Sequence, residues 1–217
     1  MSNTNSPNKN VFVCNNPLIR FFLTEIRNKN SEPLKFRSYM KEASKYLVYE
    51  ALSNIEIKTK EIETPVAIAE GIEFKNKFIV APILRAGLSM VDGIIEVLPF
   101  AQIRHIGLYR NEETLQPVEY YVKLPDAIDE NTNVLIIDPM LATGGSAISA
   151  VDVFKKRGVK GSSIKFISLI ASKIGVEKLM EAHNDIELYC ANIDSELNEK
   201  GYIVPGLGDA GDRCFGT

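Results

Sequence analysis

The chain has no tryptophan, only two histidines and only three cysteines among its 217 residues. Cys14, Cys190 and Cys214 lie far apart and form no CxxC pair, which is typical of reduced thiols in a cytoplasmic protein. His105 and His183 are also far apart and lack the spacing of metal ligands. The sequence therefore predicts neither a disulfide framework nor a metal site made by the protein alone.

An excess of charge of one sign is lacking as well. The chain has 25 Lys and Arg residues against 28 Asp and Glu residues, a net charge of −3, so nothing indicates a nucleic-acid partner or a membrane surface. No apolar run approaches the ~20 residues of a membrane span, and the start MSNTNSPNKN lacks the apolar core of a signal peptide. Any anionic ligand must be held by local groups.

What is present is the composition of an ordinary globular protein, with 45% hydrophobic and 24% charged residues. A chain of this length can bury one sizeable core. Residues 1–15 are rich in Asn and Ser and are predicted to be a mobile tail. Residues 16–217 are predicted to form a single domain.

Short apolar runs alternate with helical patterns through the chain. Helices are expected to start at Asn16-Pro17 and at Ser31-Glu32-Pro33, where proline suits the first helical position. Strands are expected at 78–84, 103–109, 118–123, 134–138, 164–171 and 186–191, and further helices at 88–98, 146–157 and 176–182. This alternation predicts an α/β fold, a parallel sheet flanked by helices, with ligands at the carboxyl ends of the strands.

The most informative segment runs from a buried strand, VLIID, through Pro-Met-Leu-Ala-Thr-Gly-Gly-Ser into a helical pattern. Glycines and a helix start can direct N–H groups at one phosphate, to which Thr143 and Ser146 add hydroxyls. Asp138 is placed to accept hydrogen bonds from the hydroxyls of a sugar. The alternative is a plain strand–turn–helix link capped by Ser146. The chain has no GxxxxGK[ST] phosphate loop and no GxSxG hydrolase motif.

This segment resembles the phosphoribosyl diphosphate (PRPP) motif of the type I phosphoribosyltransferases, in which two acidic residues follow a strand and precede Thr-Gly-Gly-Thr/Ser. The second acidic position is Pro139 here. With this proline the segment resembles the uracil phosphoribosyltransferase family. Residues 138–146 reproduce that family's motif, Asp-Pro-Met-Leu-Ala-Thr-Gly-Gly-Ser, in full. The resemblance implies that PRPP is bound by Asp138, Pro139, Met140, Leu141, Ala142, Thr143, Gly144, Gly145 and Ser146.

Two arginines follow or end predicted strands, Arg85 in Pro-Ile-Leu-Arg-Ala-Gly and Arg110 in Tyr-Arg-Asn-Glu-Glu-Thr. Their planar forks suit oxyanions, although Arg85 alone could form an ordinary surface ion pair and residues 110–117 could be an exposed loop. Both motifs resemble those of the same family. The resemblance implies that both arginines contact PRPP, that Mg²⁺ is carried on PRPP, and that a β-hairpin arm around residues 110–117 closes over the ligand.

The glycine-rich segment 201–212 leaves its backbone open to a flat polar ring, unless it is only a disordered tail. Gly206-Leu-Gly-Asp-Ala-Gly211 fits GxGxxG, but the helix and later acidic residue of a dinucleotide site are missing. The segment resembles the ending of the same family. The resemblance implies a base-binding hood from the chain ends, with uracil contacts from Ile203, Gly208, Asp209 and Ala210, and implies that Asp209 also approaches PRPP.

The resemblance thus implies a cytoplasmic enzyme of pyrimidine salvage that converts uracil and PRPP to uridine monophosphate (UMP) and diphosphate. Its catalytic residues would be Arg85, Arg110 and Asp209. A homodimer or higher assembly and GTP as a candidate effector are implied in the same way. The alternative, which the Pro139 departure allows, is a non-catalytic regulator of the same fold that senses PRPP or a nucleotide.

Overall fold

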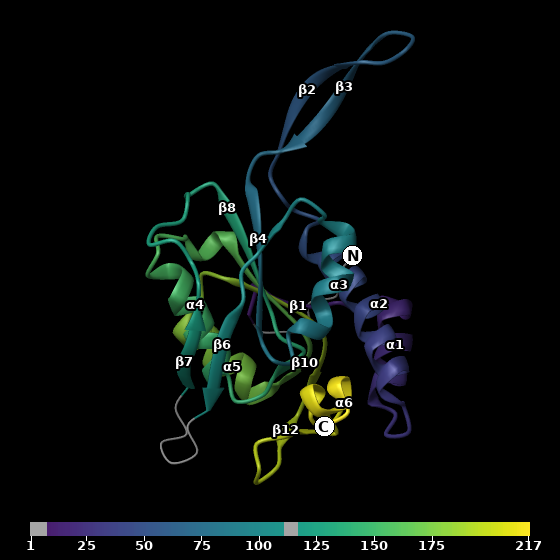
Figure 1. Cartoon of the computed structure of the whole chain (residues 1–217), viewed down its shortest axis with the longest axis vertical. Coiled ribbons are helices and arrows are strands. Elements are labelled where there is room, and N and C mark those ends of the chain that lie inside the picture. Colours follow the sequence, from purple (N-terminus) through teal and green to yellow (C-terminus); the bar gives the residue numbers. More distant parts are fainter. Residues whose placement is uncertain (1–7, 111–116) are drawn as a thin grey trace.

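The computed structural model describes residues 8–110 and 117–217. A central sheet has the strand order β1-β11-β10-β8-β4-β6-β7, with the short strands β5 beside β4 and β9 beside β10 (Figure 1). Its described pairings are parallel except that of β6 with β7. The strands are β1 (Val11–Val13), β4 (Lys77–Leu84), β5 (Gln102–Ile103), β6 (Ile106–Arg110), β7 (Pro117–Val122), β8 (Thr132–Ile137), β9 (Met140–Leu141), β10 (Ile164–Ser172) and β11 (Glu187–Asp194).

Helices cover both faces of the sheet (Figure 1). On one face α1 (Pro17–Arg27), α2 (Pro33–Ala51) and α3 (Leu88–Val97) pack in a core that includes Leu135 and Ile137 of β8. On the other face α4 (Gly145–Lys155) and α5 (Lys173–Ala182) pack in a second core that includes Val134 and Ile136. Successive residues of a strand point to opposite faces, which is why the continuous apolar run of β8 serves both cores. The predicted α/β fold is confirmed.

The first helix begins as its sequence predicts. Pro17 is its first residue, and the Asn16 side chain accepts a hydrogen bond from the Leu18 N–H at 2.8 Å. Asparagine is a favoured cap because it satisfies an N–H that has no partner within the helix. The second helix likewise begins at a proline, Pro33, after Glu32.

Part of the predicted N-terminal tail belongs to the sheet instead. β1 pairs in parallel with β11, Val11 is fully buried, and Phe12 stacks on Tyr189 with ring centroids 4.7 Å apart. The Asn- and Ser-rich composition of the segment outweighed its short Val-Phe-Val run in the prediction. Residues 11–13, which the prediction includes in the tail, thus form an edge strand of the sheet.

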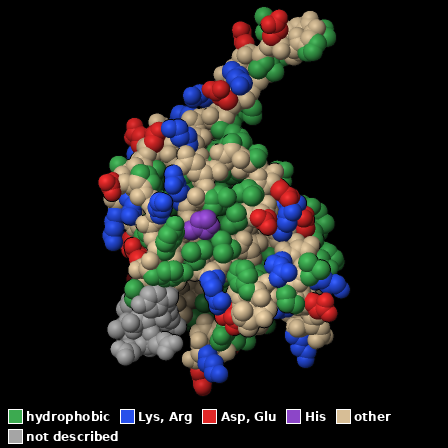
Figure 2. All heavy atoms as spheres, in the orientation of Figure 1, with side chains coloured by type: hydrophobic (Ala, Val, Ile, Leu, Met, Phe, Trp, Pro, Cys, Tyr) green, Lys and Arg blue, Asp and Glu red, His purple; other side chains and the backbone are tan. Residues whose placement is uncertain are grey.

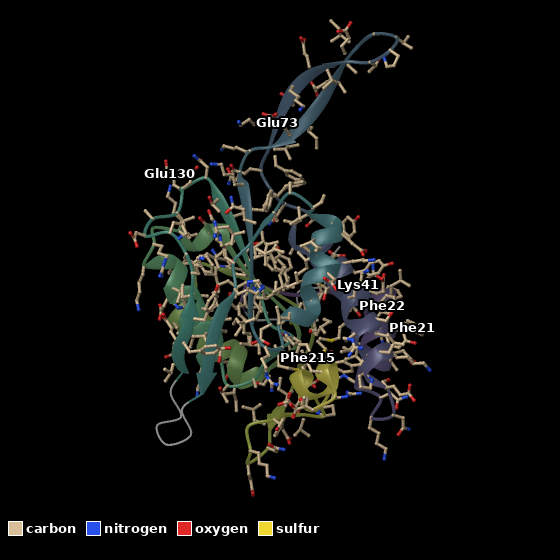
Figure 3. The ribbon with its side chains drawn as sticks, viewed as in Figure 1. Phe21, Phe22, Lys41, Glu73, Glu130 and Phe215 are labelled. Atoms are coloured by element: carbon tan, nitrogen blue, oxygen red, sulfur yellow. The ribbon has the colours of Figure 1, made fainter. Side chains whose placement is uncertain are left out.

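A second hairpin was not predicted at all. β2 (Ile57–Glu63) and β3 (Ile68–Phe74) pair antiparallel and extend far from the body (Figure 1). Charged and hydrophobic side chains are interspersed along this arm, and most of them are exposed, as Figure 2 shows. At the opposite end of the molecule lies the C-terminal segment, where β12 (Glu196–Leu197) pairs with β13 (Ile203–Val204) and α6 (Ala210–Phe215) follows. Figure 3 labels Glu73 on the arm and Phe215 on α6 at these two ends.

A short 3-10 helix, η1 (Gly161–Ser163), leads into β10. None of the helices in the described ranges is long and apolar enough to cross a membrane.

Candidate active site

The candidate site lies where the carboxyl ends of β4 and β8 face the C-terminal segment, at the lower edge of the sheet in Figure 1. Arg85 follows β4, and its Nη2 lies 3.6 Å from Oδ1 of Asp212 in α6. Asp138 follows β8 and is close enough to Asp209 for the two charges to interact. Three segments far apart in the sequence therefore meet at one edge of the sheet, as predicted for a parallel α/β protein.

The phosphate loop, residues 138–146, ends at the start of α4. The N-cap is Gly144, whose φ of +85° is in the left-handed region that favours glycine, and it makes no side-chain cap. Ser146 lies inside the first turn, so the plain link capped by Ser146 is not what the structure contains. The first N–H groups of α4 and the partly exposed Thr143 and Ser146 remain available to an anion.

Helix α5 supports this loop from behind. The Ser172 hydroxyl donates to the Ala142 carbonyl at 2.5 Å and accepts from the Gly175 N–H at 2.8 Å. A Cβ at Gly175 would lie 2.5 Å from the same carbonyl, so only glycine allows the helix to approach this closely. The sequence prediction missed both residues, although Ser-Lys-Ile-Gly directly after a buried strand is a recognisable helix start.

The turn between Asp138 and β9 is fixed by its backbone. The Pro139 carbonyl accepts from the Leu169 and Ile170 N–H groups at 3.1 Å each, and from the Ser168 hydroxyl at 3.3 Å. Ser168 is fully buried. Pro139 therefore stabilises the turn through its carbonyl, which is bound by β10. It presents no second carboxylate to a ligand.

Asp138 is held in a partly buried position at this turn, where its Oδ1 accepts from the Met140 N–H at 3.3 Å. Burial raises the pKa of Asp138 to about 7; the Met140 N–H opposes this shift, and the negative charge of Asp209 adds to it. The carboxyl group is thus poised between its neutral and charged forms near neutral pH.

Arg85 stands at a tight turn between β4 and α3. A Cβ at Gly87 would lie 2.6 Å from the carbonyl oxygens of Ile83 and Ile137, so glycine is required for the turn to close against the end of β8. The Leu84–Arg85 peptide bond is cis. The Arg85 side chain is 62% exposed and ion-paired with Asp212. The surface ion pair considered for Arg85 is present, and its partner lies in the candidate site.

The C-terminal loop, residues 203–210, contains both buried and exposed residues. Ile203 and Ala210 are each 3% exposed, whereas Gly208 and Asp209 are exposed. Gly208 is exposed with φ +80°, again in the left-handed region. The Asp209 side chain caps α6, where its Oδ1 accepts from the Asp212 N–H at 2.9 Å.

Arg110 is the predicted site residue whose side chain the structure does not describe. Its backbone ends β6 opposite Pro117, which confirms a hairpin of β6 and β7, but its side chain and residues 111–116 lie outside the described residues. Three further residues that the sequence prediction missed, Arg27, Asp194 and Arg213, bind the backbone of the C-terminal loop. They come from distant segments, and no local sequence signal marks them.

The donor set also bears on the predicted Mg²⁺. Among residues 8–110 and 117–217, no three His, Cys, Asp or Glu side chains are grouped to hold a metal ion. With proline at position 139, Asp138 and Asp209 are the carboxylates that lie close together beside the phosphate loop. Two carboxylates are hard oxygen ligands of the kind that suit Mg²⁺ carried on an anionic substrate.

Comparisons with known proteins place this arrangement in a class. A solved adenine phosphoribosyltransferase from Trypanosoma brucei aligns with a TM-score of 0.58 over 92% of this chain and 88% of its own, at 13% identity, which shows a shared fold alone. The parallel sheet, with its glycine-rich loop after β8, has the fold of a type I phosphoribosyltransferase. A solved protein from Aquifex aeolicus is 37% identical, with a TM-score of 0.87 over 94% of this chain and 97% of its own.

The family follows from closer matches. Residues 13–217 match the family model described as uracil phosphoribosyltransferase. Proteins of that name are 50% identical in Dictyoglomus thermophilum, covering 95% of this chain and 99% of theirs, and 53% identical in Ligilactobacillus salivarius, covering 94% and 97%. The chain belongs to the uracil phosphoribosyltransferase family and is a pentosyltransferase.

Proposed function

We propose that the protein transfers the phosphoribosyl group of PRPP to uracil and so makes UMP and diphosphate, a reaction of pyrimidine salvage. Uracil N1 bonds to ribose C1, the bond from C1 to the diphosphate breaks, and the N1 proton is released. The observation that carries the proposal is the meeting of the phosphate loop, Arg85 and the C-terminal loop at one edge of the sheet. A regulator that senses PRPP alone would have no need of a base loop, whereas a nucleotide sensor of the same fold would keep one.

Within this proposal the phosphate loop holds the 5′-phosphate. The free N–H groups of the first turn of α4, the positive end of its dipole and the hydroxyls of Thr143 and Ser146 all favour a phosphate. Asp138, in its carboxylate form, accepts hydrogen bonds from the ribose hydroxyls. Residues 139–142 contribute backbone that β10 and α5 fix in place.

Arg85 and Arg110 bind the diphosphate end of PRPP. Negative charge builds on the diphosphate as it leaves, and guanidinium groups aimed at that charge lower the barrier electrostatically. Arg85 has to exchange its contact with Asp212 for the substrate, which its exposure permits. Mg²⁺ arrives as part of the PRPP substrate and supplies further positive charge to the leaving group.

The base is read by main-chain groups of Ile203, Gly208 and Ala210, and Asp209 lies between the base and PRPP. Uracil presents an acceptor, a donor and an acceptor along one edge, whereas cytosine changes two of these. A backbone matched to uracil would leave buried groups unpaired with cytosine, at about 1–3 kcal/mol for each group.

The reaction is tested by product formation from purified protein with PRPP, Mg²⁺ and, in turn, uracil, cytosine, hypoxanthine and adenine, with and without GTP. We expect UMP from uracil alone. PRPP binding in a calorimeter without any nucleotide product would favour the regulator instead. A rate increase with GTP would support the effector, which rests on the resemblance.

A homodimer is part of the same proposal, and the β2–β3 arm supports it. Val66 at its tip is 94% exposed, and Ile68 and Ile72 on β3 are 71% and 60% exposed. An isolated two-stranded hairpin is marginally stable in water, so a second copy is the natural cover for its apolar side chains. Sedimentation of Ile68→Glu and of the unchanged protein tests this, and we expect the variant to be monomeric.

A cytoplasmic setting completes the proposal. Cys14, Cys190 and Cys214 are all buried and unpaired, as expected where thiols stay reduced. Burial raises the pKa of the Cys14 thiol to about 12, so that thiol is unreactive.

A further inference from the structure

Two arginines hold consecutive carbonyl groups of the C-terminal loop just before Gly208 and Ala210, two of the residues proposed to read the base. Arg27 Nη1 donates to the Gly206 carbonyl at 2.9 Å, and Arg213 Nη1 donates to the Leu207 carbonyl at 2.7 Å. Arg27 ends α1 and Arg213 lies in α6, so the two ends of the chain meet on this loop.

Arg27 is itself fixed by a buried carboxylate. Its guanidinium forms two hydrogen bonds with Asp194, at 2.8 and 2.7 Å, in the bidentate geometry that makes such pairs strong and directional. The Asp194 side chain is 3% exposed and also accepts from the Gly206 N–H at 2.9 Å and from Asn192 at 2.7 Å. One ion pair therefore binds both the N–H and the C=O of Gly206.

The charge state of this pair is secure. Burial alone would raise the pKa of Asp194, but hydrogen bonds from Arg27, Gly206 and Asn192 outweigh it and hold the pKa below its ordinary value. The carboxylate remains charged across the neutral range. A buried charge of this kind is costly unless its partners are all in place, so losing one partner disturbs the whole group.

Arg213 adds a second, independent connection. Besides Leu207, it donates to the carbonyl oxygens of Ile26 and Asn28 at the end of α1, each at 2.6 Å, and it lies over the Phe36 ring at 4.3 Å. Its guanidinium thus joins the end of α1 to the loop.

The backbone conformation of the loop is restricted at Gly206. Gly206 has φ +58°, and a Cβ there would lie 2.0 Å from the Ile203 carbonyl. The next residue after the two occupied carbonyls is Gly208, and no hydrogen bond from the described residues occupies its N–H or C=O. Gly208 therefore offers free main-chain groups directly after the two bound carbonyls.

We propose that Arg27, Asp194 and Arg213, which we call the loop anchor, are positioning residues for uracil. They fix the direction of the 206–207 carbonyls, and this fixes where Gly208 and Ala210 present their main-chain groups to the base. They do not touch the base themselves. The inference rests on the proposed function of the loop, and it adds the side chains that set its selectivity.

The test compares steady-state kinetics of Asp194→Asn and of Arg27→Lys with the unchanged protein. Asp194→Asn keeps the shape but loses the charge, and Arg27→Lys keeps the charge but loses the planar fork. We expect the KM for uracil to rise about tenfold to a hundredfold, because small displacements of a recognition group have effects of that size. We expect the KM for PRPP to change less than about twofold, and the preference for uracil over cytosine to fall.

Lys165→Gln is the matched control. Lys165 is 5% exposed and pairs with Glu187 at the amino end of β10, so its loss also removes a buried ion pair, but far from the site. We expect a lower Tm with an unchanged KM for uracil. An anchor variant that lowers Tm like this control and leaves the KM for uracil unchanged would overturn the inference, as would an equal rise in both KM values.

The unchanged protein in the same assay separates the two proposals. Absence of UMP from that protein contradicts the proposed function itself. UMP formation together with an unaltered uracil KM in both anchor variants contradicts only the loop anchor. If Asp194→Asn does not fold, the milder Arg27→Lys still decides the question.

Discussion

The phosphate loop and the C-terminal loop are built in opposite ways. The phosphate loop is one unbroken stretch from β8 into α4, supported by Ser172 and Gly175 at the adjoining start of α5. The C-terminal loop is held by α1, β11 and α6, whose residues are separated by most of the chain. The first loop is held by its own sequence and by the adjoining segment from β10 into α5, whereas the second needs the two ends of the chain brought together. We therefore expect changes around the two loops to act on different substrates.

The largest expected effect is that of Arg85→Ala, on the phosphate side. Removing a guanidinium aimed at the leaving diphosphate should lower kcat by about 10²- to 10³-fold, with little change in the KM for uracil. Steady-state kinetics with both substrates varied measures this. The control is Lys160→Ala, since Lys160 pairs with Glu130 at the opposite end of the sheet, where Figure 3 labels Glu130. A kcat within threefold of the unchanged protein would remove Arg85 from the mechanism.

Gly175→Ala should give the next largest effect. The new Cβ would lie within 2.7 Å of the carbonyl oxygens of Leu141 and Ala142, so the phosphate loop has to move. We expect stability to fall by about 1–3 kcal/mol and the KM for PRPP to rise several-fold or more, while the KM for uracil stays nearly constant. Urea unfolding and kinetics check both. Gly71→Ala in the arm, where the nearest atom would be 3.4 Å away, is the matched control and should change neither KM.

Asp138→Asn sharpens the comparison through pH. The native pKa of about 7 exceeds the ordinary 3.8, so the folded protein holds a proton that the unfolded chain releases. This contribution to stability is complete below pH 4 and is lost as the pH rises through 7. The variant lacks that loss, and because Asp138 is only partly buried we expect it to be more stable at pH 8 by about 1–2 kcal/mol.

The same titration predicts the kinetics. Ribose hydroxyls need the carboxylate as acceptor, so the KM for PRPP in the unchanged protein should fall as the pH rises from 6 to 8, and this slope should vanish in Asp138→Asn. Denaturant unfolding at pH 5 and pH 8, with kinetics over the same range, measures both effects. If Asp138→Asn were no more stable than the unchanged protein at pH 8, ionisation of Asp138 would not lower the stability of the fold.

The comparison also explains how much could be predicted from the sequence. The strand–loop–helix unit at 134–157 was predictable because a buried strand, glycines and a helix start follow one another directly. The shared edge of Asp138 and Arg85 was predictable, since each follows a parallel strand and parallel strands bring their carboxyl ends together. These are properties of short segments and of the sheet as a whole.

What could not be predicted depends on contacts between distant segments. Arg27 looks like any basic residue at a helix end, and only the fold shows that it meets Asp194 and Gly206. The β2–β3 arm was missed because nearly all of its residues are exposed, so its strands lack the alternation of a half-buried sheet. At its base Phe74 contacts Phe78 and Phe100. β1 was missed because three apolar residues are too few to outweigh a polar context.

The smallest expected effect, that of Ser172→Ala, tests whether the two loops are independent. The change removes the hydroxyl that binds the Ala142 carbonyl and caps α5, which should lower the free energy of unfolding by about 1 kcal/mol. Because the phosphate loop loses this support, the KM for PRPP should rise about two- to fivefold. Ser172→Thr keeps the hydroxyl and should restore most of the affinity. Ser172 is paired with Asp194 in the register of β10 and β11, so combining Ser172→Ala with Arg27→Lys is a strict test of independence. Independent loops require the effect on PRPP and the effect on uracil to add. If Ser172→Ala instead raised the KM for uracil as much as that for PRPP, the two loops would form one coupled unit, and the division between a local and an assembled loop would be wrong.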